Sequence, residues 1–331
     1  MLERVAIMQL RMGWIIGVLL PALGVAPHAG AQQYPTKAIR LLVGNTPGGG
    51  TDLIARTLSQ RLYEAWGHSV VVEHRPGGTG AVASVTVAKA APDGYSLMIV
   101  TSSSHAIAPA LQRDLPYHPV RDFASVALVA TAPQILVAHP ALAANSVKEL
   151  VALAKAKPGA LNYASSGTGT LGYMTAELLK SVTQTDIVHI PYKGTGSAVI
   201  ELLGGQVQLM FSAPGAVIQH VRAGKLKSMA VASAKRPAGL EDVTTFAEAG
   251  YPAIEASNWY AILTTAGTPK AIVDKLNQGI VRAVSLPDVK ESFFSQGYEA
   301  TSSTPQQLEQ LIRNDLAKWQ KVVQAAGARQ R

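Results

Sequence analysis

Loops rich in glycine and hydroxyl side chains are the parts of this sequence whose residue types and spacing suit ligand binding. Three of them run from Gly44 to Asp52, from Thr101 to Ser104 and from Ser165 to Thr170. Each follows a short apolar run typical of a strand, and the first and third lead directly into a helical pattern. Such a loop offers unpaired backbone N–H groups, hydroxyl donors and the positive end of a helix dipole, which together suit a carboxylate.

Each loop taken alone also has a purely structural explanation. Its glycines permit tight turns and its hydroxyls cap the following helix. For a single loop this explanation is the stronger one. Several such loops on two lobes, however, could clamp a small acid between them, and the recurrence of the pattern favours binding.

Known nucleotide-binding and catalytic motifs each lack a required residue here. Gly44 to Thr51 has the outer spacing of a phosphate-binding P-loop, but Gly50 stands where that loop has its lysine. The stretch 167–172 has the glycine spacing of a dinucleotide-binding turn, yet Asp186 opens the next strand, whereas the ribose-binding acid belongs at that strand's far end. Neither a Gly-x-Ser-x-Gly elbow nor a His-Glu-x-x-His pair occurs. We therefore predict no cofactor.

Cysteine and histidine usage also argues against a metal centre. The sequence contains no cysteine, and its histidines are scattered without an i, i+4 pair. This pattern offers no thiolate or paired-imidazole site, so we predict no metal. One enzymatic alternative remains, an exported α/β enzyme that uses a cleft between lobes with His105 or His189 as its base.

The composition predicts the elements that must position these loops. The chain has 331 residues, of which 48% are hydrophobic and 15% charged, so it can bury a sizeable core and exceeds the roughly 150 residues of one domain. Short apolar runs alternate with amphipathic stretches, as in sheets with crossover helices. The sequence thus predicts an α/β fold of two lobes, each a mixed, mainly parallel sheet flanked by helices.

The expected strands fall into two sets. The first comprises 39–43, 70–72 and 95–100, and the second comprises 135–138, 161–164, 187–190, 207–211 and 229–232. A strand over 258–263 is expected to cross back to the first lobe, because the helices expected over 269–284, 286–296 and 305–326 need a sheet to pack against. We expect lobe 1 to comprise 32–133 with 257–331, and lobe 2 to comprise 134–256.

The first 31 residues are typical of a cleaved signal peptide. Arg4 and Arg11 give a positive start, 12–24 is an apolar run, and Ala29-Gly30-Ala31 has the small-x-small pattern of a cleavage site. The apolar run is shorter than the roughly 20 residues that a membrane-spanning helix needs. We therefore expect a periplasmic protein, with an uncleaved N-terminal anchor as the alternative.

The formal net charge of +8 is spread thinly along the chain. No short window is mostly lysine and arginine, and aromatic residues do not alternate with basic ones, so we predict no nucleic-acid partner. A mild positive field would instead attract small anions.

Short strings of residues also occur in an order and spacing that match a known family. They are Tyr34-Pro35, Pro47-Gly48-Gly49-Gly50-Thr51-Asp52, Asn162-Tyr163-Ala164-Ser165-Ser166-Gly167, Pro191-Tyr192-Lys193-Gly194, Leu202-Leu203-Gly204-Gly205-Gln206-Val207, Ala230-Val231-Ala232-Ser233-Ala234-Lys235-Arg236 and Gly267-Thr268-Pro269. In these strings the chain resembles the substrate-binding receptors of tripartite tricarboxylate transporters, often called Bug receptors. The resemblance covers nearly the whole sequence after the leader.

The resemblance implies a two-lobed periplasmic binding fold, type II-like, that closes as a flytrap on a carboxylate or similar polar ligand. It implies a non-catalytic receptor, usually a monomer, that hands a small organic acid or amino-acid-like ligand to a membrane permease. A receptor that signals to a sensor protein is the alternative. The contacts carried over are Gly48, Gly49, Thr51, Asp52, Ser102, Ser103, Ser165, Ser166, Thr168 and Thr170. Among these, we expect Asp52 to cap its helix or orient water rather than touch an anion.

Departures from the family pattern affect which ligand is expected. Many relatives have His where this chain has Tyr173, and Asp where it has Glu201. Ser212 ends an expected strand over the cleft and is a candidate selectivity residue. Lys193 is either a partner for a second ligand carboxylate or a solvated lysine at the rim.

Overall fold

The computed structural model describes residues 34–45, 47–48, 50–112, 114–192 and 194–325. The expected signal peptide, Gly49 and Lys193 lie outside the described residues. No helix among the described residues combines the length and the apolar character needed to cross a membrane.

The first lobe is built on a six-stranded sheet with the order β11-β4-β10-β3-β1-β2. Its strands are β1 (Ile39–Val43), β2 (Val70–His74), β3 (Ser96–Thr101), β4 (Phe123–Pro133), β10 (Ser257–Thr265) and β11 (Glu299–Ala300). Strand β1 pairs in parallel with β2 and β3, and the remaining pairings are antiparallel. The helices of this lobe are α1 (Gly50–Trp66), α2 (Ala81–Ala88), α3 (Ala108–Leu111), α8 (Lys270–Ser285), α9 (Pro287–Ser295) and α10 (Pro305–Ala325).

Helix α1 shows how the periodicity of the sequence produces a buried face. Ile54, Leu58 and Leu62 are all at most 1% exposed, which is the i, i+4 spacing of one helical stripe. Helix α8 crosses α1 closely, because a Cβ on Gly279 would lie 2.3 Å from the Trp66 ring. Packing on α8 therefore holds the C-terminal end of α1.

The second lobe is built on a five-stranded sheet with the order β7-β6-β8-β5-β9. Its strands are β5 (Ile135–Ala138), β6 (Asn162–Ser165), β7 (Val188–Pro191), β8 (Leu209–Ser212) and β9 (Lys227–Val231). Strand β6 pairs in parallel with β7 and β8, whereas β5 is antiparallel to β8 and β9. The helices are α4 (Val147–Ala156), α5 (Leu171–Thr183), α6 (Thr195–Leu203) and α7 (Pro214–Arg222).

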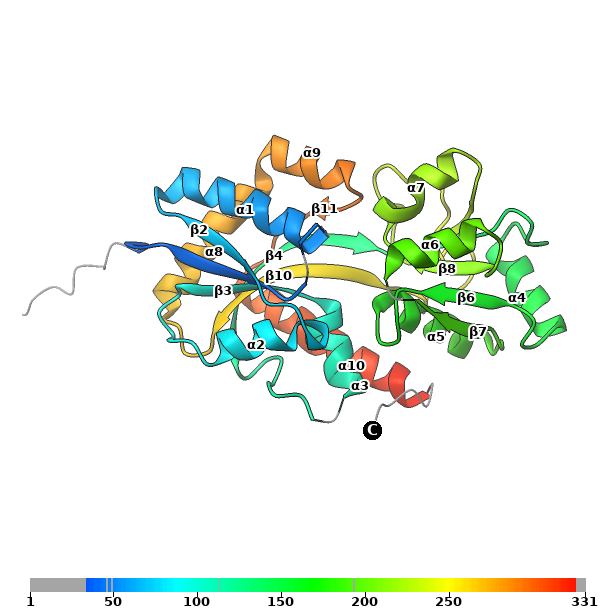
Figure 1. The fold of residues 1–331 in the computed structure, drawn as a ribbon, viewed down its shortest axis with the longest axis horizontal. Helices are drawn as coiled ribbons and strands as arrows, with labels where there is room; N and C mark the ends of the chain where they lie inside the picture. The colour runs from blue at the N-terminus through cyan, green and yellow to red at the C-terminus, as the bar shows by residue number, and fades with distance from the viewer. Residues whose placement is uncertain (1–33, 46, 49, 113, 193, 326–331) are drawn as a thin grey trace, which may run out of the picture. The chain divides into compact units, whose positions relative to one another are not determined.

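Two neighbouring strands carry the chain between the sheets (Figure 1). Strand β4 ends at Pro133, opposite Ser257 at the start of β10. Just beyond, Gln134 N–H donates to Ala256 O at 2.9 Å, and Ala232 N–H donates to Gln134 O at 2.7 Å. The outgoing and returning segments are thus tied to each other by backbone hydrogen bonds.

The predicted class, two mixed sheets flanked by helices, is confirmed. The expectation that they are mainly parallel is wrong, because antiparallel pairings in the described residues are at least as numerous as parallel ones. The long crossing strands β4 and β10 cause this difference. Strand β4 is absent from the predicted elements, since its alanine-rich run fits helix and strand alike, and α7 is absent because Pro214 and Gly215 are typical of a loop.

Candidate functional site

Loops of the two lobes enclose a cavity of about 560 Å³, which we call the cleft cavity. From the first lobe, the lining includes Gly48, Gly50, Thr51, Ser103, Ser104, Tyr260 and Tyr298. From the second lobe, it includes Ser166, Thr170, Gly172, Thr195, Ser212 and Gly215. No aspartate, glutamate, lysine, arginine or histidine among the described residues lines it. The polar part of the wall therefore consists of hydroxyls, amides and backbone groups.

The glycine loop after β1 delivers the start of α1 to the cleft cavity. A Cβ on Gly50 would lie 1.6 Å from the Tyr298 hydroxyl, so only glycine lets this tyrosine reach the first turn of α1. Burial raises the pKa of Tyr298, which keeps its hydroxyl neutral. Thr51 is buried, and its hydroxyl has no hydrogen-bond partner among the described residues. This hydroxyl is free to bind a ligand.

Asp52 shapes the glycine loop and does not line the cleft cavity. Its Oδ2 accepts the Gly48 N–H at 2.9 Å, and its Oδ1 accepts Arg56 Nε at 2.9 Å. The Gly48 N–H, followed by Arg56, holds the pKa of this carboxyl below its usual range. His74 Nδ1 lies 2.9 Å from Asn45 O, and its Nε2 lies 2.9 Å from Asp52 Oδ1 without hydrogen-bond alignment. Asp52 thus fixes the loop that presents Gly48.

The serine-rich end of β3 contains serines in different environments. Ser102 is fully buried and donates its hydroxyl to Asn258 Oδ1 at 2.6 Å, so it ties β3 to β10 and does not line the cavity. Ser103 lines the cavity, and its hydroxyl has no hydrogen-bond partner in the described part of the chain. Of these two predicted contacts, only Ser103 is therefore placed to meet a ligand.

The loop between β6 and α5 forms the opposite wall. Ser166 and Thr170 line the cleft cavity, whereas Thr168 is exposed and does not. Thr170 is the N-cap of α5, since its Oγ1 accepts the Tyr173 N–H at 3.4 Å and donates to Gly167 O at 2.8 Å. The hydroxyl of Ser166 has no partner within the described residues.

Ser165 and Tyr173 lie behind this loop rather than in the cavity wall. Ser165 is fully buried, and its Oγ lies 2.6 Å from His189 Nε2. The ring of Tyr173 packs on His189, with 4.7 Å between ring centroids. Both residues were predicted ligand contacts, and in the structure both pack behind the loop, outside the cavity wall.

The two candidate catalytic histidines each lie within hydrogen-bond distance of a serine, at 2.6 Å for His189 Nε2 and Ser165 Oγ and at 3.0 Å for His105 Nδ1 and Ser104 Oγ, and each serine also has a backbone carbonyl within reach. Ser165 Oγ donates to Gly167 O at 3.1 Å, and Ser104 Oγ donates to Thr101 O at 3.1 Å. A hydroxyl has one proton, so the arrangement that satisfies every contact has the histidine as donor to each serine. Burial lowers the pKa of His105 to about 3, and burial also lowers the pKa of His189. Neither histidine lines the cleft cavity.

Several lining residues were not selected from the sequence. Thr195 follows the Pro-Tyr-Lys-Gly stretch, which leads from an expected strand into a helix as the loops 44–52 and 165–170 do. That pattern could have identified it. Tyr298 comes from the short segment between α9 and β11, and no sequence signal links it to the glycine loop. Gln134 lies where the chain passes between the sheets, which only the fold reveals.

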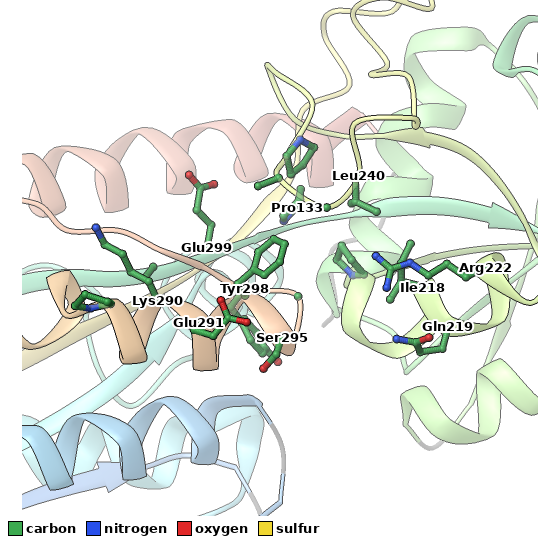
Figure 2. Close-up of a pocket in the computed structure, with 18 residues that line it drawn as sticks. Pro133, Ile218, Gln219, Arg222, Leu240, Lys290, Glu291, Ser295, Tyr298 and Glu299 are labelled. Carbon is green, nitrogen blue, oxygen red and sulfur yellow. The ribbon is translucent and has the colours of Figure 1, made fainter.

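A second cavity of about 560 Å³ lies beside the first (Figure 2). Figure 2 shows Ile218 and Arg222 of α7 on one side and Lys290 and Glu291 of α9 on the other. Tyr298 contributes to the walls of both cavities.

A backbone contact between α7 and the turn after α9 lies at the boundary of the two cavities. A Cβ on Gly215 would lie 2.3 Å from Gln296 O, and a Cβ on Gly297 would lie 2.6 Å from Gly215 N. Because Gly215 and Gln296 line the cleft cavity while Gly297 lines the second, this contact separates them.

Comparisons with known proteins agree with the fold. Residues 54–328 match the model of the tripartite tricarboxylate transporter family receptor. The chain is 36% identical to Protein BugT of Bordetella pertussis over 316 residues, which is 95% of this chain and 97% of that protein. It resembles the solved structure of R. palustris Rpa4515 with adipate, with a TM-score of 0.79 and 33% identity over 89% of this chain and 98% of that one. It also resembles MatC (Rpa3494) from Rhodopseudomonas palustris with bound malate, with a TM-score of 0.75 and 31% identity over 88% of this chain and 100% of that one.

The family match and the likeness to BugT both span most of the chain. They confirm the resemblance carried by the glycine loops and the motifs of the second lobe. The protein therefore belongs to the tripartite tricarboxylate transporter receptor family.

Proposed function

We propose that the cleft cavity captures a small organic carboxylate and that the closed protein delivers it to the membrane permease of a tripartite tricarboxylate-type transporter. The observation that carries this proposal is a set of hydroxyls around the cavity without partners among the described residues. They belong to Thr51 and Ser103 on the first lobe and to Ser166, Thr195 and Ser212 on the second. Thr51 and Ser212 are 8% and 5% exposed, and buried polar groups normally find a partner.

Helix starts add positive potential to these donors. The first turns of helices α1, α5, α6 and α7 all contribute residues to the wall of the cleft cavity. The N-terminal turn of a helix has free N–H groups and the positive end of the dipole, and both favour an anion. A carboxylate bound here needs no lysine or arginine, which agrees with a wall without charged side chains among the described residues.

The relatives support the same ligand class. Rpa4515 is solved with adipate and MatC with malate, and both are carboxylates. We propose that Gly48, Thr51, Ser103, Ser166, Thr170 and Ser212 contact the ligand of this chain. Gly49 and Lys193 remain proposed contacts outside the described residues.

The remaining finer proposals concern the hinge, the compartment and the class of protein. We propose that the lobes divide at 133/134 and 256/257, where backbone hydrogen bonds join Gln134 to Ala256 and Ala232. The family consists of periplasmic receptors, so we propose export through residues 1–31, a monomer in the periplasm and no enzymatic activity.

Thermal unfolding of the protein purified from periplasm tests the proposed ligand class. The panel includes adipate, malate, monocarboxylates and the diamide of adipic acid as an uncharged control. A ligand at about 100 times its dissociation constant adds roughly 2.7 kcal/mol of stability, so a saturable rise in Tm is expected for a carboxylate and none for the diamide. Equal stabilisation by acid and diamide would contradict the carboxylate proposal. Mass spectrometry of the denatured sample detects a ligand that copurifies.

A further inference from the structure

We propose that His189, which lies outside the cleft cavity, is a positioning residue for the ligand-binding loop 165–170. In this proposal its Nε2–H holds the Ser165 hydroxyl, and Ser165 in turn holds Gly167, so that Ser166 between them faces the cavity. The inference rests on the proposed function for its effect on ligand affinity, but the ordering of the loop is measurable without any ligand.

Ser165 is the centre of three contacts. Its Oγ accepts the Gly167 N–H at 3.1 Å, donates to Gly167 O at 3.1 Å and lies 2.6 Å from His189 Nε2. The hydroxyl has one proton and two acceptor positions. When that proton goes to Gly167 O, both acceptor positions are filled by the Gly167 N–H and an Nε2–H of His189. Every polar atom of the contact is then satisfied.

Two tyrosines fix the imidazole ring in the orientation that this contact needs. Tyr163 stacks on it with 4.8 Å between centroids and 22° between planes, and Tyr173 packs at 4.7 Å and 46°. The Tyr163 hydroxyl donates to Glu177 Oε1 at 2.8 Å, and Lys180 Nζ donates to the same oxygen at 2.9 Å. Tyr163 and His189 are also direct partners in the parallel β6–β7 register.

The loop that Ser165 holds is rich in glycine. Gly167 has φ +132° and Gly169 has φ +83°, and glycine gives such a turn wide conformational freedom when it is unrestrained. Gly167 O also accepts from Thr170, through its Oγ1 at 2.8 Å and its backbone N–H at 3.4 Å, whereas the Gly167 N–H is held by Ser165. Loss of the His189 donor would leave Ser165 free to rotate and would loosen Gly167, which lies next to the cavity-lining Ser166.

Protonation of His189 should leave its proposed hydrogen bond to Ser165 intact. Glu177 and Lys180 of α5 act in opposite directions on its pKa, and burial lowers it. Protonation adds a proton to Nδ1 and leaves Nε2–H in place. The proposed contact to Ser165 therefore persists in both charge states, unlike a contact in which Nε2 accepts from the serine.

Paired substitutions separate hydrogen bonding from packing. His189→Phe keeps a ring between the tyrosines and removes the donor, whereas His189→Gln keeps an N–H donor at a similar reach. Val188→Thr, on an exposed neighbour in the same strand, is the matched control. In the ligand-free protein, amide hydrogen exchange over 165–170 should accelerate in His189→Phe and stay near wild type in the other two.

Affinity is measured for the carboxylate that gives the largest thermal shift in the wild type. His189→Phe should weaken it roughly tenfold, which corresponds to about 1.4 kcal/mol, and His189→Gln should restore most of the loss. Equal losses in both variants, or no loss in either, would overturn the positioning role. If the wild type binds no carboxylate, the proposed function fails, and the exchange measurement still decides the role of His189.

The ring tautomer provides a test that does not depend on a variant folding. In wild-type protein labelled with ¹⁵N-histidine, the ring nitrogen shifts of His189 distinguish Nε2–H from Nδ1–H. An Nε2–H tautomer is expected at neutral pH. An Nδ1–H tautomer would mean that Ser165 donates to His189, and the proposed chain of contacts would then be wrong.

Discussion

At the residue scale, the hydroxyl groups around the cleft fall into two groups, those that hydrogen-bond to the protein and those that do not. Ser102 and Ser165 are fully buried, and both are committed to protein partners. Thr51, Ser103 and Ser166 line the cavity and have no such partner in the described structure. Sequence shows only that these residues carry hydroxyls, because the partner of each depends on segments as distant as Asn258. The structure therefore separates groups that shape the loops from groups available to a ligand.

Removing one available hydroxyl from each lobe tests this division. Thr51→Ala combined with Ser166→Ala should weaken carboxylate affinity by roughly 100-fold or more, since each hydrogen bond to a charged group contributes about 1.5 kcal/mol or somewhat more and about 1.4 kcal/mol is tenfold in affinity. The Tm of the ligand-free protein should change little, because neither hydroxyl bonds the protein. Isothermal titration calorimetry gives the affinity.

Thr168→Ala is the matched control, because Thr168 belongs to the same loop but is exposed and outside the cavity wall. It should bind as the wild type does. A comparable loss of affinity in Thr168→Ala would show that the cavity wall is wrongly assigned.

Buried His105 predicts how stability depends on pH. Burial lowers its pKa from 6.5 to about 3, so between these values the unfolded chain binds a proton that the folded chain does not. The free energy of unfolding should therefore fall as the pH is lowered from 6.5, by up to about 1.4 kcal/mol per pH unit from this group. Urea unfolding at a series of pH values measures the slope.

His105→Asn should flatten this slope, because the asparagine side chain does not titrate. His68→Gln, which replaces a partly exposed histidine beyond α1, is the matched control for the loss of a histidine. A wild-type slope retained by His105→Asn would assign the acid sensitivity to other groups.

At the element scale, the cleft depends on how closely each helix start approaches a strand. Gly172 is the second residue of α5, and a Cβ there would lie 2.6 Å from Phe211 O of β8. Glycine thus allows α5 to place its first turn against the cavity wall. Periodicity predicts that α5 exists, and its loop composition predicts an N-cap, but the distance to β8 depends on tertiary packing. Composition also limits the prediction of elements, since β4 and α7 lack a clear pattern while α1 and α5 follow from the helical patterns after their loops.

Gly172→Ala should move the start of α5 away from β8. We expect a loss of about 1–3 kcal/mol in the free energy of unfolding, as for overpacking, together with weaker ligand binding. Gly196→Ala is the matched control, because Gly196 is the second residue of α6 and a Cβ there would meet nothing within 4 Å. Denaturant unfolding compares the two. Similar stabilities for both variants would contradict the close approach of α5 to β8.

At the scale of the whole molecule, the two lobes meet through backbone contacts between residues that are distant in the sequence. No sequence pattern predicts these contacts. The α/β class, the two mixed sheets and the receptor family were all predictable from alternating apolar runs and ordered motifs. The contact between Gly215 and Gln296 joins residues about 80 positions apart in the chain, and no periodicity or motif relates them. The same holds for Gly50 and Tyr298, which come together only once the chain has crossed between the sheets twice.

Closure of the lobes should be sensitive to one methyl group at Gly215. A Cβ there would lie 2.3 Å from Gln296 O, so Gly215→Ala should hold the lobes apart without disturbing the core of either lobe. The ligand then binds a closed state that fewer molecules adopt. The apparent dissociation constant equals the intrinsic one divided by the fraction of closed molecules, so it should rise roughly tenfold or more. Small-angle scattering at saturating ligand should give a larger radius of gyration for Gly215→Ala than for the wild type or Gly196→Ala.

Because Gly196 meets nothing within 4 Å of an added Cβ, its variant accounts for any general effect of replacing glycine near the cleft. Wild-type affinity and scattering in Gly215→Ala would show that ligand binding does not depend on this contact.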